Sequence, residues 1–192
     1  MDDRNVWRSR AAALVEASLS RPRLDHSREV ARLASELCDR FHADEEKGYI
    51  AGIAHDLARE LDISEMLLLA EKDGLPLRDW EKANPLLLHG RAAAAILSKH
   101  TGYTDAETLQ AVRDHVTGRG SMGPISKIVF AADFLEPTRD FVSPEFRRRT
   151  LGLSLDEMVL AVLERKIHFV RAAAKEVVAD ALALHEELTT DA

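Results

Sequence analysis

Apolar residues recur at helical spacing along most of this chain, and that periodicity constrains its fold more than any other feature. One stripe comprises Val30, Leu33, Ala34, Leu37, Cys38 and Phe41. Its members are three or four positions apart, so they share one face of a helix. Alternation of apolar and polar residues over strand length is not found. The sequence therefore predicts an all-α fold, a helical bundle in which each helix buries one face.

The length and composition suit one domain. The chain has 192 residues, of which 46% are hydrophobic and 31% charged, enough apolar material for a core. No linker or internal repeat divides it. We therefore expect one domain over residues 1–192. The last helical stretch should break near residues 171–175, so that residues 171–192 form a C-terminal helix.

Several helix ends can be predicted from capping signals. Asp44 is a predicted N-cap for a helix over residues 45–60. The spacings Asp62-x-x-Glu65, Thr104-x-x-Glu107 and Ser154-x-x-Glu157 each predict a capping box. Ala51 and Gly52 are small, which leaves room for neighbouring helices to approach the helix that carries them.

Charge and cysteine content exclude several classes of protein. The 26 Lys and Arg against 33 Asp and Glu give a net charge of −7, which argues against binding to nucleic acid. No apolar run is long enough for a membrane span, and the acidic N-terminus has no signal-peptide core. The single cysteine, Cys38, fits a reducing compartment. We expect a cytoplasmic protein with no membrane and no nucleic-acid partner.

Six polar residues occur in strongly apolar helical contexts: His26, His55, Asp56, His89, His115 and Asp133. An ionised carboxylate on an apolar face costs several kcal/mol unless it is paired or bound to a metal. A helical bundle commonly builds a metal site from such inward-facing side chains on different helices. The alternative is a set of separate hydrogen-bonded core histidines, with Asp133 paired to Arg113 or Lys127. One metal centre satisfies all six residues together, so it is the favoured interpretation.

The order H…HD…H…H…D resembles the HD-domain metal-dependent phosphohydrolases, and most closely their YqeK-like branch, the symmetrical diadenosine tetraphosphatases of bacteria. Four strings carry the resemblance: His55-Asp-Leu-Ala-Arg-Glu-Leu61, Asn84-Pro-Leu-Leu-Leu-His-Gly90, His115-Val-Thr-Gly-Arg119 and Lys127-Ile-Val-Phe-Ala-Ala-Asp-Phe-Leu-Glu-Pro-x-Arg-Asp140. The similarity covers about residues 20–170. This chain departs from the family pattern at Arg59, usually Lys, and at Val116, usually Thr. It also has Val177-Val-Ala-Asp180 where the family tends to have a His-Pro element.

The resemblance implies a centre of two divalent metal ions, iron first, with manganese or another divalent metal as alternatives. One ion would be held by His26, His55, Asp56 and Asp133, and Asp56 would bridge to a second ion held by His89 and His115. The catalytic residues implied are His55, Asp56 and Arg59. A hydroxide bridging the two metals would attack diadenosine tetraphosphate and give two molecules of ADP.

Substrate contacts are expected from cations and from a glycine-rich loop. The resemblance favours Arg59, Lys127 and Arg139 as contacts to the polyphosphate. In the loop, Arg119 and the backbone N–H groups at Thr117 and Gly118 could bind phosphate.

Two other functions stay open. The same six residues would serve an HD phosphohydrolase acting on another nucleotide: a nucleoside triphosphate, a mononucleotide or a signalling nucleotide. A non-enzymatic metal-binding helical protein is the third hypothesis, although the Glu-x-x-His pairs typical of such bundles are missing near the site. Homodimer formation is left open, because sequence alone does not separate an exposed apolar stripe from the core.

Overall fold

The computed structural model describes residues 3–190, and every regular element in that range is helical, which confirms the all-α prediction. The α-helices are α1 (Asp3–Ser18), α2 (Arg21–Arg40), α3 (Glu45–Ala54), α4 (Ile63–Ala70), α5 (Asp79–Ala83), α6 (His89–Thr101), α7 (Ala106–Asp114), α8 (Pro124–Leu135), α9 (Pro144–Leu151), α10 (Leu155–Ala172) and α11 (Ala179–Thr190). Two 3₁₀ helices, η1 (Glu71–Asp73) and η2 (Pro85–Leu88), precede α5 and α6 respectively.

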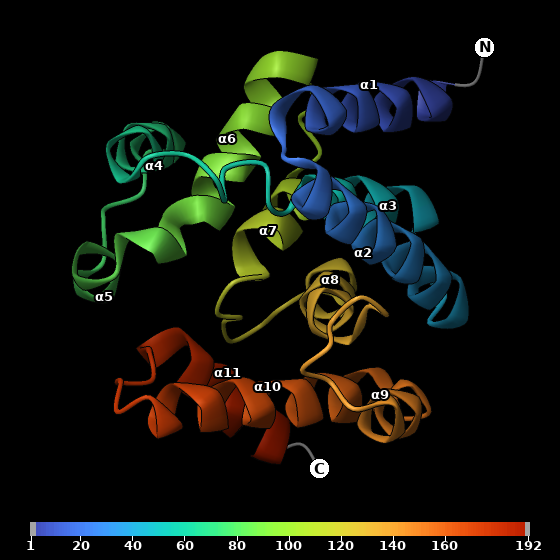
Figure 1. Ribbon diagram of the computed structural model, residues 1–192, viewed down its shortest axis with the longest axis vertical. Coiled ribbons are helices and arrows are strands. Elements are labelled where there is room, and N and C mark those ends of the chain that lie inside the picture. Colours follow the sequence, from blue (N-terminus) through green and yellow to red (C-terminus); the bar gives the residue numbers. More distant parts are fainter. Residues whose placement is uncertain (1–2, 191–192) are drawn as a thin grey trace.

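The helices form a larger bundle with a smaller C-terminal layer (Figure 1). In the bundle α2 packs along α3, and both contact α8, while α7 packs between α6 and α8. In the C-terminal layer α10 contacts α8, and α9 and α11 pack on α10. Because the layer joins the bundle through α8 and α10, side chains of α10 can reach the centre of the bundle.

The predicted apolar stripe of α2 is confirmed as core. Val30, Ala34 and Cys38 are fully buried, and Leu33 and Leu37 are nearly so. The sixth residue of the stripe, Phe41, follows the last residue of α2 and is half-buried against the core. Gly52 allows α2 and α3 to approach closely, because a Cβ atom there would lie 2.8 Å from the Cα of Ala31.

Helix boundaries differ from expectation where local hydrogen bonds change. Asp44 caps α3 as predicted, its carboxylate accepting from two backbone N–H groups. The expected helix over 45–60 ends at Ala54, because turns with i to i−3 hydrogen bonds replace the α-helical pattern beyond it. His55 and Asp56 fall at that change, so the turns set the directions of both side chains.

The capping boxes have mixed outcomes. Ser154 and Glu157 form the predicted box at the start of α10. Asp105, one residue beyond the predicted Thr104, caps α7. Asp62 precedes α4 but makes no side-chain cap, so that box is not formed. The predicted break in the last helical stretch is confirmed and spans residues 173–178.

Across residues 3–190, none of the helices combines the length and apolar character that a membrane crossing requires.

Candidate metal centre

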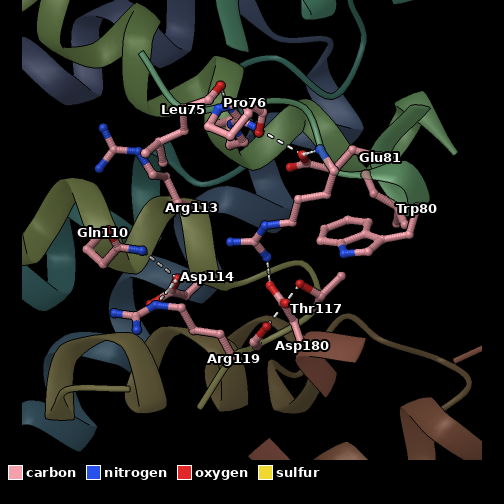
Figure 2. Close-up of a pocket in the computed structure, with 14 residues that line it drawn as sticks. Leu75, Pro76, Trp80, Glu81, Gln110, Arg113, Asp114, Thr117, Arg119 and Asp180 are labelled. Atoms are coloured by element: carbon pink, nitrogen blue, oxygen red, sulfur yellow. Dashed lines mark hydrogen bonds and ion pairs between the residues drawn. The ribbon is translucent and has the colours of Figure 1, made fainter. Parts of the chain in front are cut away.

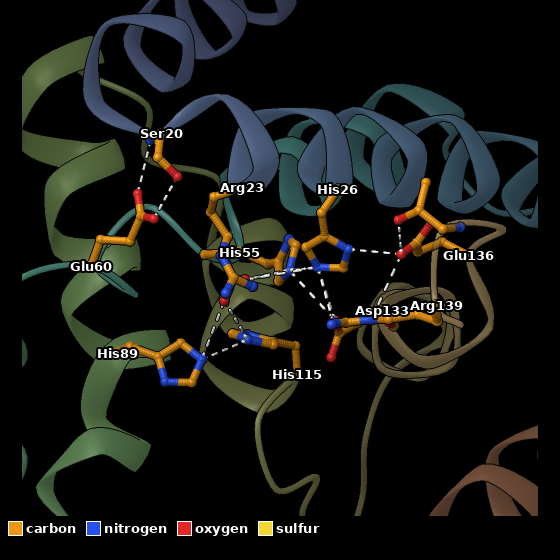
Figure 3. Close-up of polar contacts among 12 residues, drawn as sticks. Ser20, Arg23, His26, His55, Glu60, His89, His115, Asp133, Glu136 and Arg139 are labelled. Atoms are coloured by element: carbon orange, nitrogen blue, oxygen red, sulfur yellow. Dashed lines mark hydrogen bonds and ion pairs between the residues drawn. The ribbon is translucent and has the colours of Figure 1, made fainter. Parts of the chain in front are cut away.

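The structure brings all six predicted ligands together in the middle of the bundle (Figure 3). They come from five places: α2 supplies His26, the turn after α3 supplies His55 and Asp56, the first residue of α6 is His89, the residue after α7 is His115, and α8 supplies Asp133. Asp133 is 13% exposed, and the other five are buried. Residues up to 107 positions apart (133 − 26 = 107) thus share one polar centre in an apolar bundle.

A first group of donor atoms is formed by His26, His55 and Asp56, whose potential ligand atoms all lie within 4.8 Å of one another. The two Nε2 atoms are 3.2 Å apart, and the Nε2 of His55 is 3.4 Å from the Oδ2 of Asp56. Asp133 adjoins this group, with its Oδ1 3.2 Å from the Nε2 of His26 and 3.6 Å from that of His55. Two imidazoles and two carboxylates therefore surround one point.

A second group is formed by Asp56, His89 and His115, again within 4.8 Å. The Nε2 atoms of the two histidines are 3.1 Å apart. The Oδ1 of Asp56 lies 3.4 Å from the Nε2 of His89 and 3.7 Å from that of His115. The two oxygens of Asp56 thus face different groups, the arrangement that a carboxylate bridging two cations requires.

The four histidines are oriented by hydrogen bonds from their other ring nitrogen. The Nδ1–H groups of His55, His89 and His115 donate to the backbone carbonyls of Gly52, Leu86 and Val112 at 2.6–2.7 Å. That of His26 donates to the Glu136 carboxylate at 3.0 Å. Because the Nδ1 atom of each ring is held in this way, the Nε2 atom faces the centre, as in metal-binding histidines.

Electrostatics in the second group favour a cation. Burial and the neighbouring His115 lower the pKa of His89 to about 3. Burial also lowers the pKa of His115. Both rings are therefore neutral near pH 7, and two lone pairs face each other at 3.1 Å without a proton between them. A divalent cation placed there removes this repulsion, so the donor set fits a metal ion.

The first group concentrates negative charge. Burial alone would lower the pKa of His55, but the Asp56 and Asp133 carboxylates raise it to about 10. Burial opposes ionisation of both carboxyls, yet the histidines around them hold the pKa of Asp56 and of Asp133 well below the usual range. The first group therefore also favours positive charge at its centre. Imidazole and carboxylate together suit iron, manganese, zinc or nickel.

Three cationic side chains reach the two carboxylates. Arg139 donates to the Oδ1 of Asp133 and to the Nε2 of His26, the latter at 3.0 Å. The Nη1 of Arg23 is 2.8 Å from the Oδ2 of Asp56. The Nζ of Lys166 lies 3.8 Å from the Oδ2 of Asp133. The sequence predicts Arg139 as a substrate contact and singles out neither Arg23 nor Lys166.

The predicted substrate residue Arg59 lies beside the second group. It is half-buried, and its side chain forms no hydrogen bond or ion pair within residues 3–190. Its positive charge contributes to the lowered pKa of His89. Arg59 is thus available to a ligand at the metal centre.

Lys127 is held elsewhere. Its Nζ forms an ion pair with Asp156 of α10 at 2.6 Å, in a surface recess that Met122 and Pro124 also line. It precedes Asp133 by six residues on α8, which is about 9 Å along a helix axis. The structure does not bring Lys127 together with the six candidate ligands.

Thr117, Gly118 and Arg119 line a pocket of about 210 Å³ beside α7 rather than the centre itself (Figure 2). Arg119 pairs there with Asp114 at 3.0 Å. Gly118 is buried, and a Cβ atom on it would lie 2.5 Å from the Cδ2 of Leu184. Thr117 alone also lines a second cavity that borders the metal centre.

A buried carboxylate behind the first group was missed by the sequence analysis. Glu136 accepts hydrogen bonds from His26 at 3.0 Å and from the hydroxyl and backbone N–H of Thr138, each at 2.6 Å. Burial alone would raise the pKa of Glu136, but these bonds lower it. Glu136 therefore fixes the ring orientation of His26. It stands in one of the strings that carry the family resemblance, and that is its only sequence signal.

Comparison with known proteins identifies the class that this fold and site define. The model of the HD domain family matches residues 23–138, more than half of the chain and the range that holds all six candidate ligands. A crystal structure of a predicted HD superfamily hydrolase involved in NAD metabolism, from Clostridium acetobutylicum, superposes with a TM-score of 0.90 at 28% identity, covering 96% of this chain and 97% of that one.

Curated relatives narrow the class further. The symmetrical bis(5'-nucleosyl)-tetraphosphatase of Halalkalibacterium halodurans is 32% identical over 94% of this chain and 96% of its own length. That of Bacillus subtilis is 30% identical over 84% of this chain and 87% of its own length. The chain belongs to the HD domain family and, within it, to the family of symmetrical bis(5'-nucleosyl)-tetraphosphatases. It is therefore a hydrolase, and the resemblance seen in the sequence is confirmed.

Proposed function

We propose that this protein hydrolyses dinucleoside tetraphosphates at the middle of the phosphate chain, converting diadenosine tetraphosphate into two molecules of ADP. One observation carries the proposal. Two three-residue donor groups share Asp56 in a chain that resembles named symmetrical tetraphosphatases over most of its length. A cytoplasmic location agrees with the single buried cysteine, Cys38.

The centre would hold two divalent ions, with iron as the first choice and manganese as an alternative. His26, His55, Asp56 and Asp133 would hold one ion, and Asp56, His89 and His115 the other. Two such ions supply a water-derived nucleophile at neutral pH and neutralise charge on the phosphate oxygens.

Phosphate binding would depend on the cations around the carboxylates. Arg23 and Arg139 line a recess of about 330 Å³ that reaches His26 and opens to the surface. Both now pair with carboxylates that a metal ion would neutralise, so metal binding frees these guanidinium groups for phosphate oxygens. Arg59, whose charge acts on His89, would contribute a further cation. These local cations let an acidic protein bind a polyanion.

Another nucleotide is the second candidate substrate. The Clostridium acetobutylicum neighbour, which is described as involved in NAD metabolism, is the observation that supports it. The same six residues would serve either reaction. The side chains that contact the nucleotide around the centre would therefore determine which substrate is cleaved.

Product analysis tests the proposal. The purified chain is incubated with diadenosine tetraphosphate and Fe²⁺ or Mn²⁺ without oxygen, and the nucleotides are separated by ion exchange. ADP as sole product is the expected result, and AMP with ATP would contradict symmetrical cleavage. If a protein that binds two metals shows no turnover, a panel of nucleoside triphosphates, mononucleotides and signalling nucleotides tests the second candidate. Asp56→Ala is the inactive control, because it removes the shared ligand.

A further inference from the structure

A cavity of about 490 Å³ lies between the bundle and the C-terminal layer, and its walls are mostly aliphatic. That size lies within the range of about 300–1,000 Å³ usual for small-molecule sites. It is formed by η2, the residues after α7, one face of α10, and the segment that joins α10 to α11. The lining comprises Asn84, Leu86, Leu87, Val116, Thr117, Leu163, Lys166, Ile167, Val170, Lys175, Glu176, Val177, Val178 and Ala181.

Three lining residues connect the cavity directly to the metal centre. The backbone carbonyl of Leu86 accepts the Nδ1–H of His89, and Val116 follows His115 in the chain. Lys166 of α10 donates to the backbone carbonyl of His115 at 3.1 Å. The inner end of the cavity therefore adjoins the second donor group.

Lys166 stands at this inner end with its charge directed at the centre. Its Nζ lies 3.8 Å from the Oδ2 of Asp133 and 4.0 Å from the centroid of the Phe130 ring. Three other polar residues of the lining are exposed: Asn84, Lys175 and Glu176. A cavity with aliphatic walls and a lysine beside a metal centre suits a ligand that has a flat apolar part joined to a phosphate. Inorganic phosphate alone would leave those walls unfilled.

We propose that this cavity binds one nucleoside moiety of the substrate. The purine base lies between α10 and the 177–178 segment, and Lys166 contacts the phosphate that joins the nucleoside to the metal centre. This proposal rests on the proposed hydrolysis of a dinucleoside polyphosphate and names the subsite for its base. It also gives a role to Val177 and Val178, which stand where the sequence departs from the family pattern.

Filling the cavity tests the proposal. Val170 and Val177 line it and are half-buried, so Trp can be introduced at either position with limited disturbance of the core. Leu182 of α11 is 45% exposed and lies outside the lining, so Leu182→Trp is the matched control. Circular dichroism and metal content establish that each variant retains its fold and its centre.

The first readout is ADP binding to the Mn²⁺-loaded full-length chain by calorimetry. Val170→Trp and Val177→Trp should each weaken ADP affinity by about tenfold or more, as loss of a base pocket does, and Leu182→Trp should not. Inorganic diphosphate should bind all four proteins equally. ADP affinity within twofold of wild type in both cavity variants overturns the proposal.

The second readout separates this proposal from the proposed function. In the wild-type chain, turnover of diadenosine tetraphosphate tests the reaction, whereas ADP binding tests the cavity. If the wild type turns over the substrate, the cavity variants should raise KM more than they lower kcat. If it does not, a cavity-dependent loss of ADP binding still supports the subsite, and absence of ADP binding to the wild type refutes it.

Discussion

The Nε2 atoms of His89 and His115 lie 3.1 Å apart, although both rings donate their Nδ1 protons to backbone carbonyls. Burial keeps both rings neutral, so two lone pairs point at the same small space. Such an arrangement is unfavourable for the bare side chains and favourable around a cation. The centre is therefore built for metal at some cost to the metal-free fold.

Metal removal should lower the thermal stability of the protein. A cation that binds only the folded chain stabilises it by about 2.7 kcal/mol at a hundredfold excess over Kd. For a chain of this size that corresponds to a rise in Tm of about 5–10 °C. Differential scanning calorimetry with Mn²⁺ and with a chelator checks this. The Asp56→Ala variant should show equal Tm values in both conditions, and equal values in the wild type would count against a metal centre.

Variants that each lack one candidate ligand should show whether the two donor groups bind separate metal ions. His89→Ala removes a ligand of the second group alone, and His26→Ala removes one of the first alone. Each should reduce binding from two divalent ions per chain to one, whereas Asp56→Ala should abolish both. Metal analysis after dialysis measures the stoichiometry. An identical loss in all three variants would indicate a single site.

The helices and the six candidate ligands that the structure brings together could be predicted because both depend on local pattern. The apolar stripe of α2 is spaced by the helical repeat, and Asp133 stands out because a carboxylate interrupts an apolar run. Arg23 and Lys166 could not be predicted in the same way. Each is a cation on a helix with other charged residues nearby, and only the packing of α10 on α8 brings Lys166 to the centre.

Glycine at position 90 should be required for His89 and His115 to lie close together in the second donor group. It follows His89, and a Cβ atom there would lie 2.9 Å from the carbonyl oxygens of Val112 and Arg113 on α7. Gly90→Ala would push α6 from α7, costing about 1–3 kcal/mol and separating His89 from His115. Chemical unfolding and metal analysis should show lower stability and loss of one ion. The control is Gly123→Ala, where the nearest atom is 3.9 Å away, and equal effects in the two variants would refute this reasoning.

The contribution of Glu136 to stability should depend on pH. Hydrogen bonds from His26 and Thr138 lower the pKa of this carboxyl, although burial alone would raise it. A lowered folded-state pKa means that the contribution is present above the unfolded pKa of about 4.3 and is lost as pH falls through the folded value. Metal-free Glu136→Gln should thus be about 1–3 kcal/mol less stable than wild type near pH 7, with a smaller difference in acid. Urea unfolding at several pH values measures this, and a difference independent of pH would contradict it.

Substitution of Arg139 and substitution of Lys127 should change kcat/KM by different amounts. The sequence predicts that both residues contact substrate, but the structure places them differently. Arg139 touches Asp133 and His26, whereas Lys127 pairs with Asp156 near the surface. Loss of a charged hydrogen bond to phosphate costs about 1.5–3 kcal/mol, so Arg139→Ala should lower kcat/KM by about tenfold to a hundredfold. Lys127→Ala should change kcat/KM by less than about twofold, because the Lys127 ammonium group pairs with Asp156 and not with a residue of the centre. Steady-state kinetics of both variants with diadenosine tetraphosphate measure these effects. A large loss of kcat/KM in Lys127→Ala would contradict the prediction and support Lys127 as a substrate contact.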